Sequence, residues 1–476
     1  MKCVRCDNSH VTFTPIQSML TRRDVVQRLS VGLGGFALAS LLGDASADEF
    51  TVRPKPPHVP PKAKAVILLF QNGGPSHVDL FDPKPELVKR AGQKPGEGYV
   101  NTVNVSKTGT WLRSPFAFKK HGQSGMELSE LLPNLGRHAD DIALIRSMIT
   151  EHSNHEQAIW NFNTGLVTPG RPAMGAWITY GLGTLNRDLP AYVAIMNPTG
   201  LPVDGVRNFS SGFLPPMYQG FPMRAEGTPV LNLQPRTSQE AADGRLQFLR
   251  QLNREHLAQR PGQLELEARI QSFELAARMQ LAASDALDLS KEPAHIHTLY
   301  GTDKPTSATY ARQLLLARRL VERGVRFVQV LHAGQPWDTH SNNDANLRTL
   351  CARQDQPDAA LLADLKQRGL LDETLVIWGG EFGRTPMAEG ANGRDHHKYA
   401  FSLWMSGGGI KGGVTHGATD EFGYRSVENV VTTADLHATI LHQLGLDHRR
   451  LDFQTTTRAE RLTDVHEARI VREILT

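Results

Sequence analysis

TLVIWGGEFGRTPMAEGANGRDHHKYAFSLWM, residues 374–405, is the stretch that best indicates how this chain folds. It opens with Leu375–Trp378, a short apolar run with β-branched side chains that ends at two glycines. This is the pattern of a buried parallel strand that enters a loop. Ligands of open α/β sheets bind outside the carboxyl ends of the strands, so Glu381 and Arg384 stand where chemistry is expected.

The second half of the same stretch carries a group of polar residues. Asp395, His396 and His397 come just before another apolar run, at 399–405. If that run is the next strand, these three side chains fold over the same rim as Glu381. The stretch therefore predicts the edge of a catalytic or metal-binding cleft.

Apolar runs of the same kind recur along the chain and alternate with helical patterns. The strand-like runs lie at 65–70, 141–148, 192–196 and 325–331, and the helical patterns at 310–323, 358–368 and 432–446. This alternation predicts an α/β fold with a mostly parallel central sheet flanked by helices. We expect residues 65–476 to form a single domain, with a helical insertion at about 236–290.

The composition excludes some classes of partner. Of the 476 residues, 40% are hydrophobic, which is enough for a large core. Lys and Arg number 52 against 49 Asp and Glu, so the formal charge is +3. A charge this small offers no electrostatic footprint for a polyanion, so neither nucleic acid nor an anionic membrane is expected as a partner.

Residues 1–47 have the pattern of an N-terminal extension with an export signal. The twin arginines Arg22 and Arg23 precede an apolar, glycine-bearing run at 29–42, and Ala45-Ser46-Ala47 offers a small-residue cleavage site. This pattern predicts export by the twin-arginine machinery, to the periplasm or the cell surface.

Two alternatives stay open in this region. The signal can remain attached as an uncleaved anchor, although the apolar run is shorter than the ~20 residues that a membrane span needs, so no stable span is expected. Translation can begin at Met1 or at Met19. A Pro-rich linker, 48–64, then leads into the domain.

The three cysteines predict neither a disulfide nor a structural zinc site. Cys3 and Cys6 lie upstream of the cleavage site, which leaves Cys351 alone in the mature chain. The Cys3-x-x-Cys6 pair lacks further ligands at the spacing that a closed zinc site needs. The mature protein is therefore expected to depend on its core for stability.

Residues that bind metals or transfer protons follow several of the predicted strands. Imidazoles together with carboxylates are the usual ligands of zinc, while carboxylate-rich sets also suit manganese, calcium or magnesium. A single pair is better explained by a hydrogen-bonded loop histidine, so a metal site requires that several loops converge. The candidates are His77, Asp79, His152, His155, Asp338, His340, Glu381, Asp395, His396 and His397.

Several motifs, taken together, identify a family. They are GGPSHVDLFDPKP (73–85), HEQAIWNFNTG (155–165), SGFLPPMYQG (211–220), WDTHSNN (337–343), GGEFGRTP (379–386), GRDHHKYAFSLWMSGGGIKGG (393–413) and ADLHATILHQLGL (434–446). They resemble the exported family named domain of unknown function 1501, over essentially the whole mature chain. That family is placed in the alkaline phosphatase and sulfatase superfamily, so the resemblance implies an alkaline-phosphatase-like α/β/α sandwich.

The resemblance implies a site for two metal ions. In the superfamily the ligands are an Asp after the first strand, an Asp-His pair, an Asp-x-x-x-His motif and a late His. Asp338 and His340 match the third element, although the His follows two residues after the Asp and Asn342 takes the fourth place. The late His matches His396 or His397, which completes one position for a divalent metal, with zinc favoured.

The other metal position departs from the superfamily pattern. The Asp after the first strand falls on Asn72, and the Asp-His pair falls on Glu381 and Phe382. A carboxylate is kept there and an imidazole is lost. We therefore expect one metal ion rather than two.

The nucleophile departs as well. The superfamily uses a Ser, Thr or formylglycine at a helix start, and that position falls on His155, with Ser153 as the nearest hydroxyl. A histidine can accept a phosphoryl group, bind a metal or act as general acid or base. The Cys/Ser-x-Pro-x-Arg motif of formylglycine enzymes is absent and Cys351 lies in CARQD, so the usual sulfatase chemistry is not expected.

The leading hypothesis is an exported metal-dependent hydrolase of phosphate, sulfate or related esters, acting on a small-molecule or glycan ester. It assigns catalysis to His155 and Arg384, with Arg394 as a further cation for the oxyanion. Its metal ligands are Asp338, His340, Glu381, His396 and His397, with Asn72, His77, Asp79, His152 and Asp395 as possible additions. The alternatives are a non-catalytic binding or cell-surface protein that keeps the fold, and another metal-dependent transfer reaction.

Overall fold

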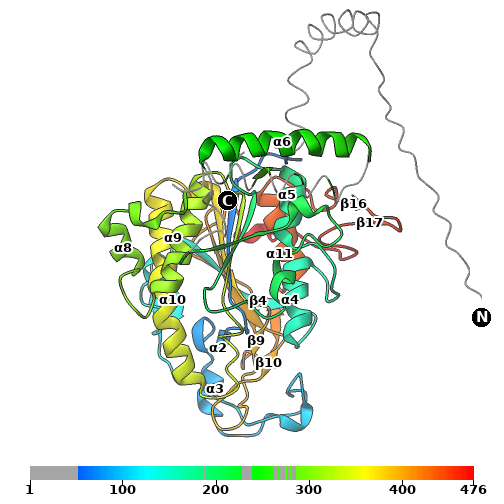
Figure 1. Ribbon diagram of the computed structural model, residues 1–476. Coiled ribbons are helices and arrows are strands. Elements are labelled where there is room, and N and C mark those ends of the chain that lie inside the picture. Colours follow the sequence, from blue (N-terminus) through cyan, green and yellow to red (C-terminus); the bar gives the residue numbers. More distant parts are fainter. Residues whose placement is uncertain are drawn as a thin grey trace, which may run out of the picture. The chain divides into compact units, whose positions relative to one another are not determined.

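A nine-stranded sheet forms the centre of the molecule (Figure 1). The computed structural model describes residues 52–186, 188–227, 238–260 and 286–476, together with 266, 270, 274, 275 and 279. The predicted export signal at 1–47 therefore lies outside the described residues, and the predicted insertion at 236–290 lies partly outside them. The described part from Val52 to Thr476 is one compact unit.

The strand order along the sheet is β12-β4-β11-β8-β1-β7-β5-β6, and β15 pairs with β4 beyond the end of β12. The strands are β1 (Ala65–Phe70), β4 (Ile142–Ile149), β5 (Tyr192–Met196), β6 (Phe221–Arg224), β7 (Phe327–Leu331), β8 (Thr374–Gly379), β11 (Phe401–Ser406), β12 (Val414–His416) and β15 (Val431–Thr432). β1 lies in the middle and is paired in parallel with both β7 and β8. All six of its residues are buried, which is why its sequence is apolar without alternation.

One strand runs against the others. β11 pairs antiparallel with both β8 and β4, while the remaining pairs of this sheet are parallel. The start of β11 therefore lies at the edge where the parallel strands end. This direction brings the residues just before β11 to the same rim as the loops that follow β1, β4, β7 and β8.

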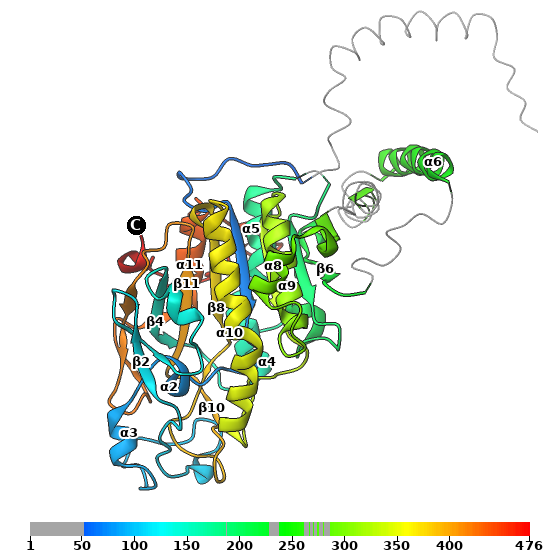
Figure 2. The same ribbon diagram turned by 90° about the vertical axis from the view of Figure 1, so that its left-hand side faces the viewer.

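Helices cover both faces of the sheet (Figures 1 and 2). One face carries α8 (Ala294–Tyr300), α9 (Ala308–Glu322) and α10 (Asn343–Gln367), and the other carries α4 (His155–Thr164), α5 (Met174–Leu182) and α11 (Thr433–Gln443). Successive side chains of β1 alternate between the two cores: Ile67 and Leu69 pack with α9 and α10, whereas Val66 and Leu68 pack with α5 and α11. The predicted α/β fold with a mostly parallel, helix-flanked sheet is confirmed.

The remaining elements are short or lie outside the two layers. They are α2 (His77–Leu80), α3 (Pro85–Lys89), α6 (Gln239–Ala258) and the antiparallel pairs β2 (Phe118–His121) with β3 (Met126–Ser129), β9 (Gly383–Arg384) with β10 (His396–His397), β13 (Ala418–Thr419) with β14 (Ser426–Glu428), and β16 (Phe453–Gln454) with β17 (Ala459–Glu460). Among the helices that the structure describes, none is both long enough and apolar enough to cross a membrane.

The helix predicted at 358–368 is the one that the sequence pattern places least well. α10 begins at Asn343, fifteen residues earlier, and runs through Pro357. A proline inside a helix removes one backbone hydrogen bond and usually marks a boundary, so the local pattern does not indicate that α10 continues through Pro357. The helix at the end of the chain starts as predicted, because Thr432 and Asp435 form a capping box at the beginning of α11.

Candidate metal centre

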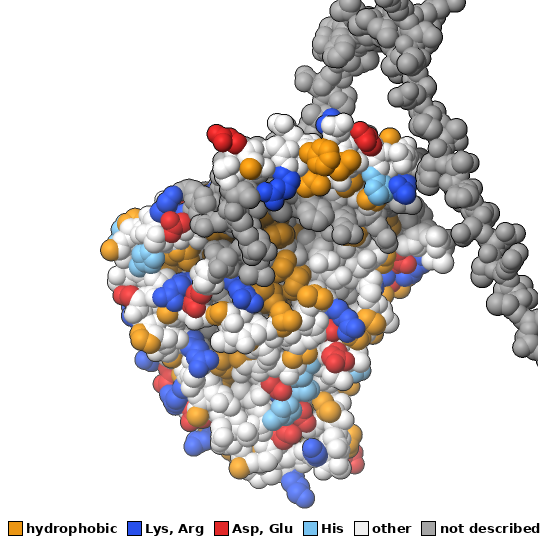
Figure 3. Space-filling view, in the orientation of Figure 1, with side chains coloured by type: hydrophobic (Ala, Val, Ile, Leu, Met, Phe, Trp, Pro, Cys, Tyr) orange, Lys and Arg blue, Asp and Glu red, His pale blue; other side chains and the backbone are white. Residues whose placement is uncertain are grey.

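The loops that leave four parallel strands meet at one edge of the sheet. The loop after β1 brings Asn72, the loop after β4 leads to His155 at the start of α4, and the loop after β7 brings Asp338 and His340. The loop after β8 forms the small β9–β10 ribbon, in which Arg384 is paired with His396. The face drawn in Figure 3 carries histidine and acidic side chains together in its lower half.

Three side chains form a compact triangle of ligand atoms. His340 Nε2 lies 2.9 Å from Asp338 Oδ1 and 3.0 Å from His396 Nε2. His396 Nε2 lies 3.2 Å from the same oxygen of Asp338. In a tetrahedral zinc site with bonds of 2.0–2.1 Å, neighbouring ligand atoms are about 3.3 Å apart. The triangle thus has the size of one face of such a site.

Each of the two imidazoles of the triangle also makes a hydrogen bond through its other ring nitrogen, Nδ1. Nδ1 of His340 is hydrogen-bonded to Glu389, and Nδ1 of His396 lies 2.8 Å from the carbonyl oxygen of Ser153. In the neutral imidazole, an acceptor at Nδ1 makes that nitrogen the proton-bearing one and leaves Nε2 with its lone pair toward the triangle. Carboxylates and carbonyls hold metal-binding histidines in the same way.

His155 stands beside the triangle and is held by a different carboxylate. Its Nδ1 lies 2.7 Å from Glu381 Oε1, which also accepts the backbone N–H of Gly73 at 2.9 Å. Its Nε2 lies 3.3 Å from Asp338 Oδ1 but makes no hydrogen bond within the described part of the chain. His155 therefore presents a buried ring nitrogen with no hydrogen-bond partner to the centre.

Asp338 is the electrostatic focus of the group. Burial opposes its ionisation, but contacts with His155, His340 and His396 and the charge of Arg384 outweigh burial and hold its pKa far below the usual range. The hydrogen bond to Asp338 raises the pKa of His340 to about 9. For His155, the contacts with Asp338 and Glu381 outweigh burial and raise the pKa, while burial lowers that of His396.

Arg384 is fully buried and tied to the protein. Its Nη2 donates to Asp338 Oδ1 at 2.6 Å and to the carbonyl of Gly73, Nε donates to the carbonyl of Gly74, and Nη1 to that of Arg394. These bonds use at least four of the five N–H groups of a guanidinium. Arg384 thus anchors Asp338 to the loop after β1, and its geometry does not fit the oxyanion-binding role that we expected for it.

The arrangement fits one divalent cation. Two overlapping sets bring their ligand atoms within 4.8 Å of one another: His155, Asp338 and His396, and His340, Asp395 and His396. Imidazole nitrogens and a carboxylate oxygen are the ligands that zinc prefers. Glu381 was expected as a ligand, but its Oε1 holds His155 and Gly73 instead, and its buried Oε2 has no hydrogen-bond partner among the described residues.

A second cation has no comparable set of ligands in the described part of the chain. Asn72 is fully buried, and both of its amide atoms lack a hydrogen-bond partner there. The ring of Phe382 lies with its centroid 4.8 Å from those of both His155 and His396. Phe382 fills the space beside the triangle and offers no ligand atom.

Several predicted site residues lie elsewhere. Asp79 forms a buried two-point ion pair with Arg394, with distances of 2.7 and 3.0 Å, so neither group is open to a substrate or a metal. His77 and His397 are buried, and their Nε2 atoms bind the carbonyl oxygens of Gly423 and Tyr424.

Of the adjacent histidines, only His396 therefore reaches the centre. Next to it, Asp395 accepts Asn101 Nδ2 at 2.6 Å and the N–H of His396 at 2.7 Å, and lies 3.9 Å from His340 Nδ1. His152 is exposed and accepts the N–H of Asn154, and the hydroxyl of Ser153 bonds to Thr102.

Two contributors were not anticipated from the sequence. Glu389 supports His340, and Asn101 holds Asp395. Glu389 lies in the irregular segment between Arg384 and Arg394, where an acidic residue has no distinguishing pattern. Asn101 is almost 300 positions away from its partner, so no local signal links the two.

The fold and the site define an α/β protein with a histidine and carboxylate centre at the carboxyl edge of its sheet. The sequence model of the family described as "Protein of unknown function (DUF1501)" matches residues 63–475, so the chain belongs to this family and the motif-based assignment is confirmed. A search of the curated proteins finds no match.

Solved structures with a similar arrangement include enzymes of several kinds. The lipoteichoic acid synthase LtaP from Listeria monocytogenes is 10% identical, covers 87% of this chain and 76% of its own, and has a TM-score of 0.32. The PsFucS1 sulfatase from Pseudoalteromonas sp. is 12% identical with coverages of 81% and 68% and a TM-score of 0.35. The phosphonate monoester hydrolase SpPMH from Silicibacter pomeroyi is 12% identical, with coverages of 87% and 76% and a TM-score of 0.34.

The buried Asp79–Arg394 pair generates a stability prediction. Replacing Arg394 with Met leaves the carboxylate of Asp79 buried without a counter-charge, so we expect the free energy of unfolding to fall by ~3–5 kcal/mol in urea titrations. Lys64→Met, which removes an exposed pair with Glu373, is the control and should change it by less than ~1 kcal/mol. Equal effects of the two substitutions would contradict a structural role for Arg394.

Proposed function

We propose that this chain is an exported, metal-dependent hydrolase of phosphate, sulfate or related esters. The observation that carries the proposal is the triangle of Asp338, His340 and His396, whose ligand atoms lie 2.9–3.2 Å apart while both rings are held from behind. Without a bound cation, three imidazoles and Arg384 crowd a single carboxylate oxygen. A divalent cation coordinated by these atoms accounts for their close approach.

In this proposal Asp338, His340 and His396 hold the ion, with zinc favoured. Three protein ligands leave a further position open, as in catalytic zinc sites. A divalent ion in such a site polarises an ester oxygen and activates water. Arg384 keeps the Asp338 oxygen in place, and Glu389 keeps the ring of His340 in one tautomer.

His155 is proposed as the group that moves protons. Glu381 accepts a hydrogen bond from the proton-bearing Nδ1 of His155. In the neutral ring, Nε2 is then the nitrogen that removes a proton from water and returns one to the leaving group. Nε2 is buried and lies 3.3 Å from Asp338 Oδ1, so the nitrogen that exchanges the proton faces the proposed metal site. Glu381 is then a positioning residue for His155 rather than a metal ligand.

A non-catalytic binding protein is the second candidate, and one observation favours it. Phe382 lies against both His155 and His396, where a second cation would need a polar ligand. A one-ion site without a hydroxyl nucleophile can serve to hold an anionic group without cleaving it. Turnover, or its absence, separates the two candidates.

The metal assignment predicts how single substitutions change the metal content. The purified wild-type protein should contain about one zinc-type ion per chain by elemental analysis, and His340→Ala and His396→Ala should lose it. His397→Ala is the matched control from the neighbouring position and should keep the ion. Glu389→Gln should weaken binding by ~10–100-fold, because it supports a ligand without being one. Full metal content in both His340→Ala and His396→Ala would contradict the assignment.

The role of His155 predicts a loss of turnover without a loss of metal. On a panel of aryl phosphate, phosphodiester and sulfate substrates, His155→Gln should lower kcat by ~10²–10⁴-fold and keep the ion. His152→Gln, at an exposed histidine three residues earlier, should retain wild-type activity. If the metal-loaded wild-type protein turns over no substrate of the panel, the binding alternative is favoured. If His155→Gln loses the ion, His155 is a metal ligand.

Export by the twin-arginine pathway is part of the proposal and is supported by the sequence of residues 1–47. When Arg22 and Arg23 are changed to lysine, the protein should remain in the cytoplasm, because the transport machinery recognises the arginine pair. Fractionation of cells that carry each form gives the answer. Equal amounts of both forms in the periplasm or on the surface would refute this route.

A further inference from the structure

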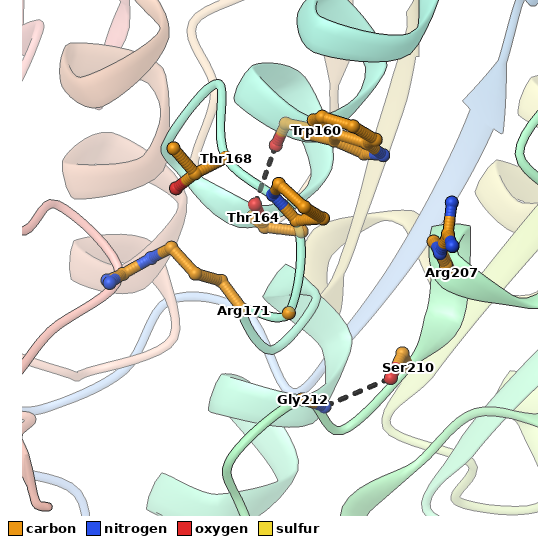
Figure 4. A pocket seen from close by; sticks show the side chains of 9 residues that line it. Trp160, Thr164, Thr168, Arg171, Arg207, Ser210 and Gly212 are labelled. Atoms are coloured by element: carbon orange, nitrogen blue, oxygen red, sulfur yellow. Dashed lines mark hydrogen bonds between the residues drawn. The ribbon is translucent and has the colours of Figure 1, made fainter.

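A cavity of about 300 Å³ lies along α4, the helix that begins at His155, and along the loop that follows it (Figure 4). α4 provides one wall, and the residues around η3 (Gly205–Phe209) provide another. Two of the family motifs, 155–165 and 211–220, meet here, and only the first residue of the earlier motif takes part in the centre. The lining is Trp160, Thr164, Thr168, Pro169, Gly170, Arg171, Arg207, Ser210 and Gly212.

Trp160 differs from every other tryptophan of the chain. The protein has six tryptophans, and the other five are at most 3% exposed, whereas Trp160 is only partly buried. Its Nε1 is hydrogen-bonded to Asp204, which fixes the ring. Figure 4 places this indole above Thr164 at one side of the cavity. A fixed, partly exposed indole is a large apolar surface that a ligand can cover.

The charges around the cavity are already neutralised. Arg207 is paired with Asp204 at 2.9 Å, and Arg171 with Glu460 at 2.7 Å. The cavity therefore offers no uncompensated charge and does not favour an anion. A charged ester group is better accommodated at the metal centre.

The lining nevertheless keeps hydrogen-bonding groups for a neutral ligand. Ser210 Oγ accepts the N–H of Gly212 at 3.0 Å, so its own hydroxyl proton remains available. An apolar ring face beside a hydroxyl donor matches a pyranose, which has C–H faces and hydroxyl edges.

We propose that this cavity is a subsite for a neutral sugar ring, stacked on Trp160, of a saccharide that carries its ester group at the metal centre. Trp160 follows His155 by five residues on α4, a rise of about 7.5 Å and a rotation of about 140°, so the two side chains leave different sides of the helix at a fixed separation and the saccharide has to pass around α4. The position of the ester rests on the proposed function. The sugar-binding cavity itself does not depend on it.

Direct binding tests the subsite without turnover. Isothermal titration of the wild-type protein with neutral hexoses, N-acetylhexosamines and their di- and tetrasaccharides should detect at least one ligand. Trp160→Ala should weaken that binding at least tenfold, and Trp160→Phe, which keeps an aromatic face, should weaken it less. Phe248→Ala, at an aromatic residue that is 61% exposed on α6, is the matched control and should bind as the wild type does.

The fluorescence of Trp160 gives a second, independent measurement. Because the other tryptophans are buried, acrylamide should quench mainly Trp160, and the bound sugar should protect it. Comparing monomers with oligosaccharides separates recognition of a free sugar from recognition of a polymer.

The possible failures of the two proposals are distinguishable. His155→Gln should bind the sugar as well as the wild type does. If the wild-type protein binds the sugar but turns over no ester, the subsite is supported and the proposed hydrolase activity is contradicted. The subsite is overturned if no sugar of the panel binds or protects Trp160, or if folded Trp160→Ala and Trp160→Phe bind with wild-type affinity.

Discussion

A single carboxylate oxygen organises the functional end of this molecule. Asp338 Oδ1 lies within 3.3 Å of nitrogens from His155, His340, His396 and Arg384. Burial disfavours a charge at Asp338, and only the surrounding nitrogens keep this group ionised. The four nitrogens come from three loops, so the sheet must place those loops within a few ångströms of one another. The position of every other residue in the centre follows from this requirement.

The sheet meets this requirement through its strand directions. β1, β7 and β8 are adjacent and parallel, so their loops leave at one edge. A histidine that precedes a strand would normally lie at the opposite edge. β11 is antiparallel to β8 and β4, and this reversal brings His396 to the rim through the β9–β10 ribbon. One reversed strand thus completes the triangle.

The same edge also contains polar residues with purely structural partners. Asp79 and Arg394 neutralise each other in full burial, and His77 and His397 bind backbone carbonyls. Such groups have the same residue types as the proposed metal ligands and lie within a few positions of them. What separates the two sets is what the imidazoles face: Nε2 of His77 and of His397 binds a backbone carbonyl, whereas Nε2 of His155, His340 and His396 all face one oxygen of Asp338.

The sequence by itself determined the fold class, the main strands, the cap of α11 and the family, because apolar periodicity and short motifs are local properties of the chain. It also indicated Asp338, His340 and His396 as candidates. Only the tertiary structure shows that His396, not His397, lies against His340 and that Glu381 is hydrogen-bonded to His155. It also shows that hydrogen bonds within the protein occupy the guanidinium groups of Arg384 and Arg394. Neighbouring residues on an extended segment point in opposite directions, and a guanidinium is free or occupied according to carbonyls far away in sequence. These are properties of three-dimensional packing that no local pattern records.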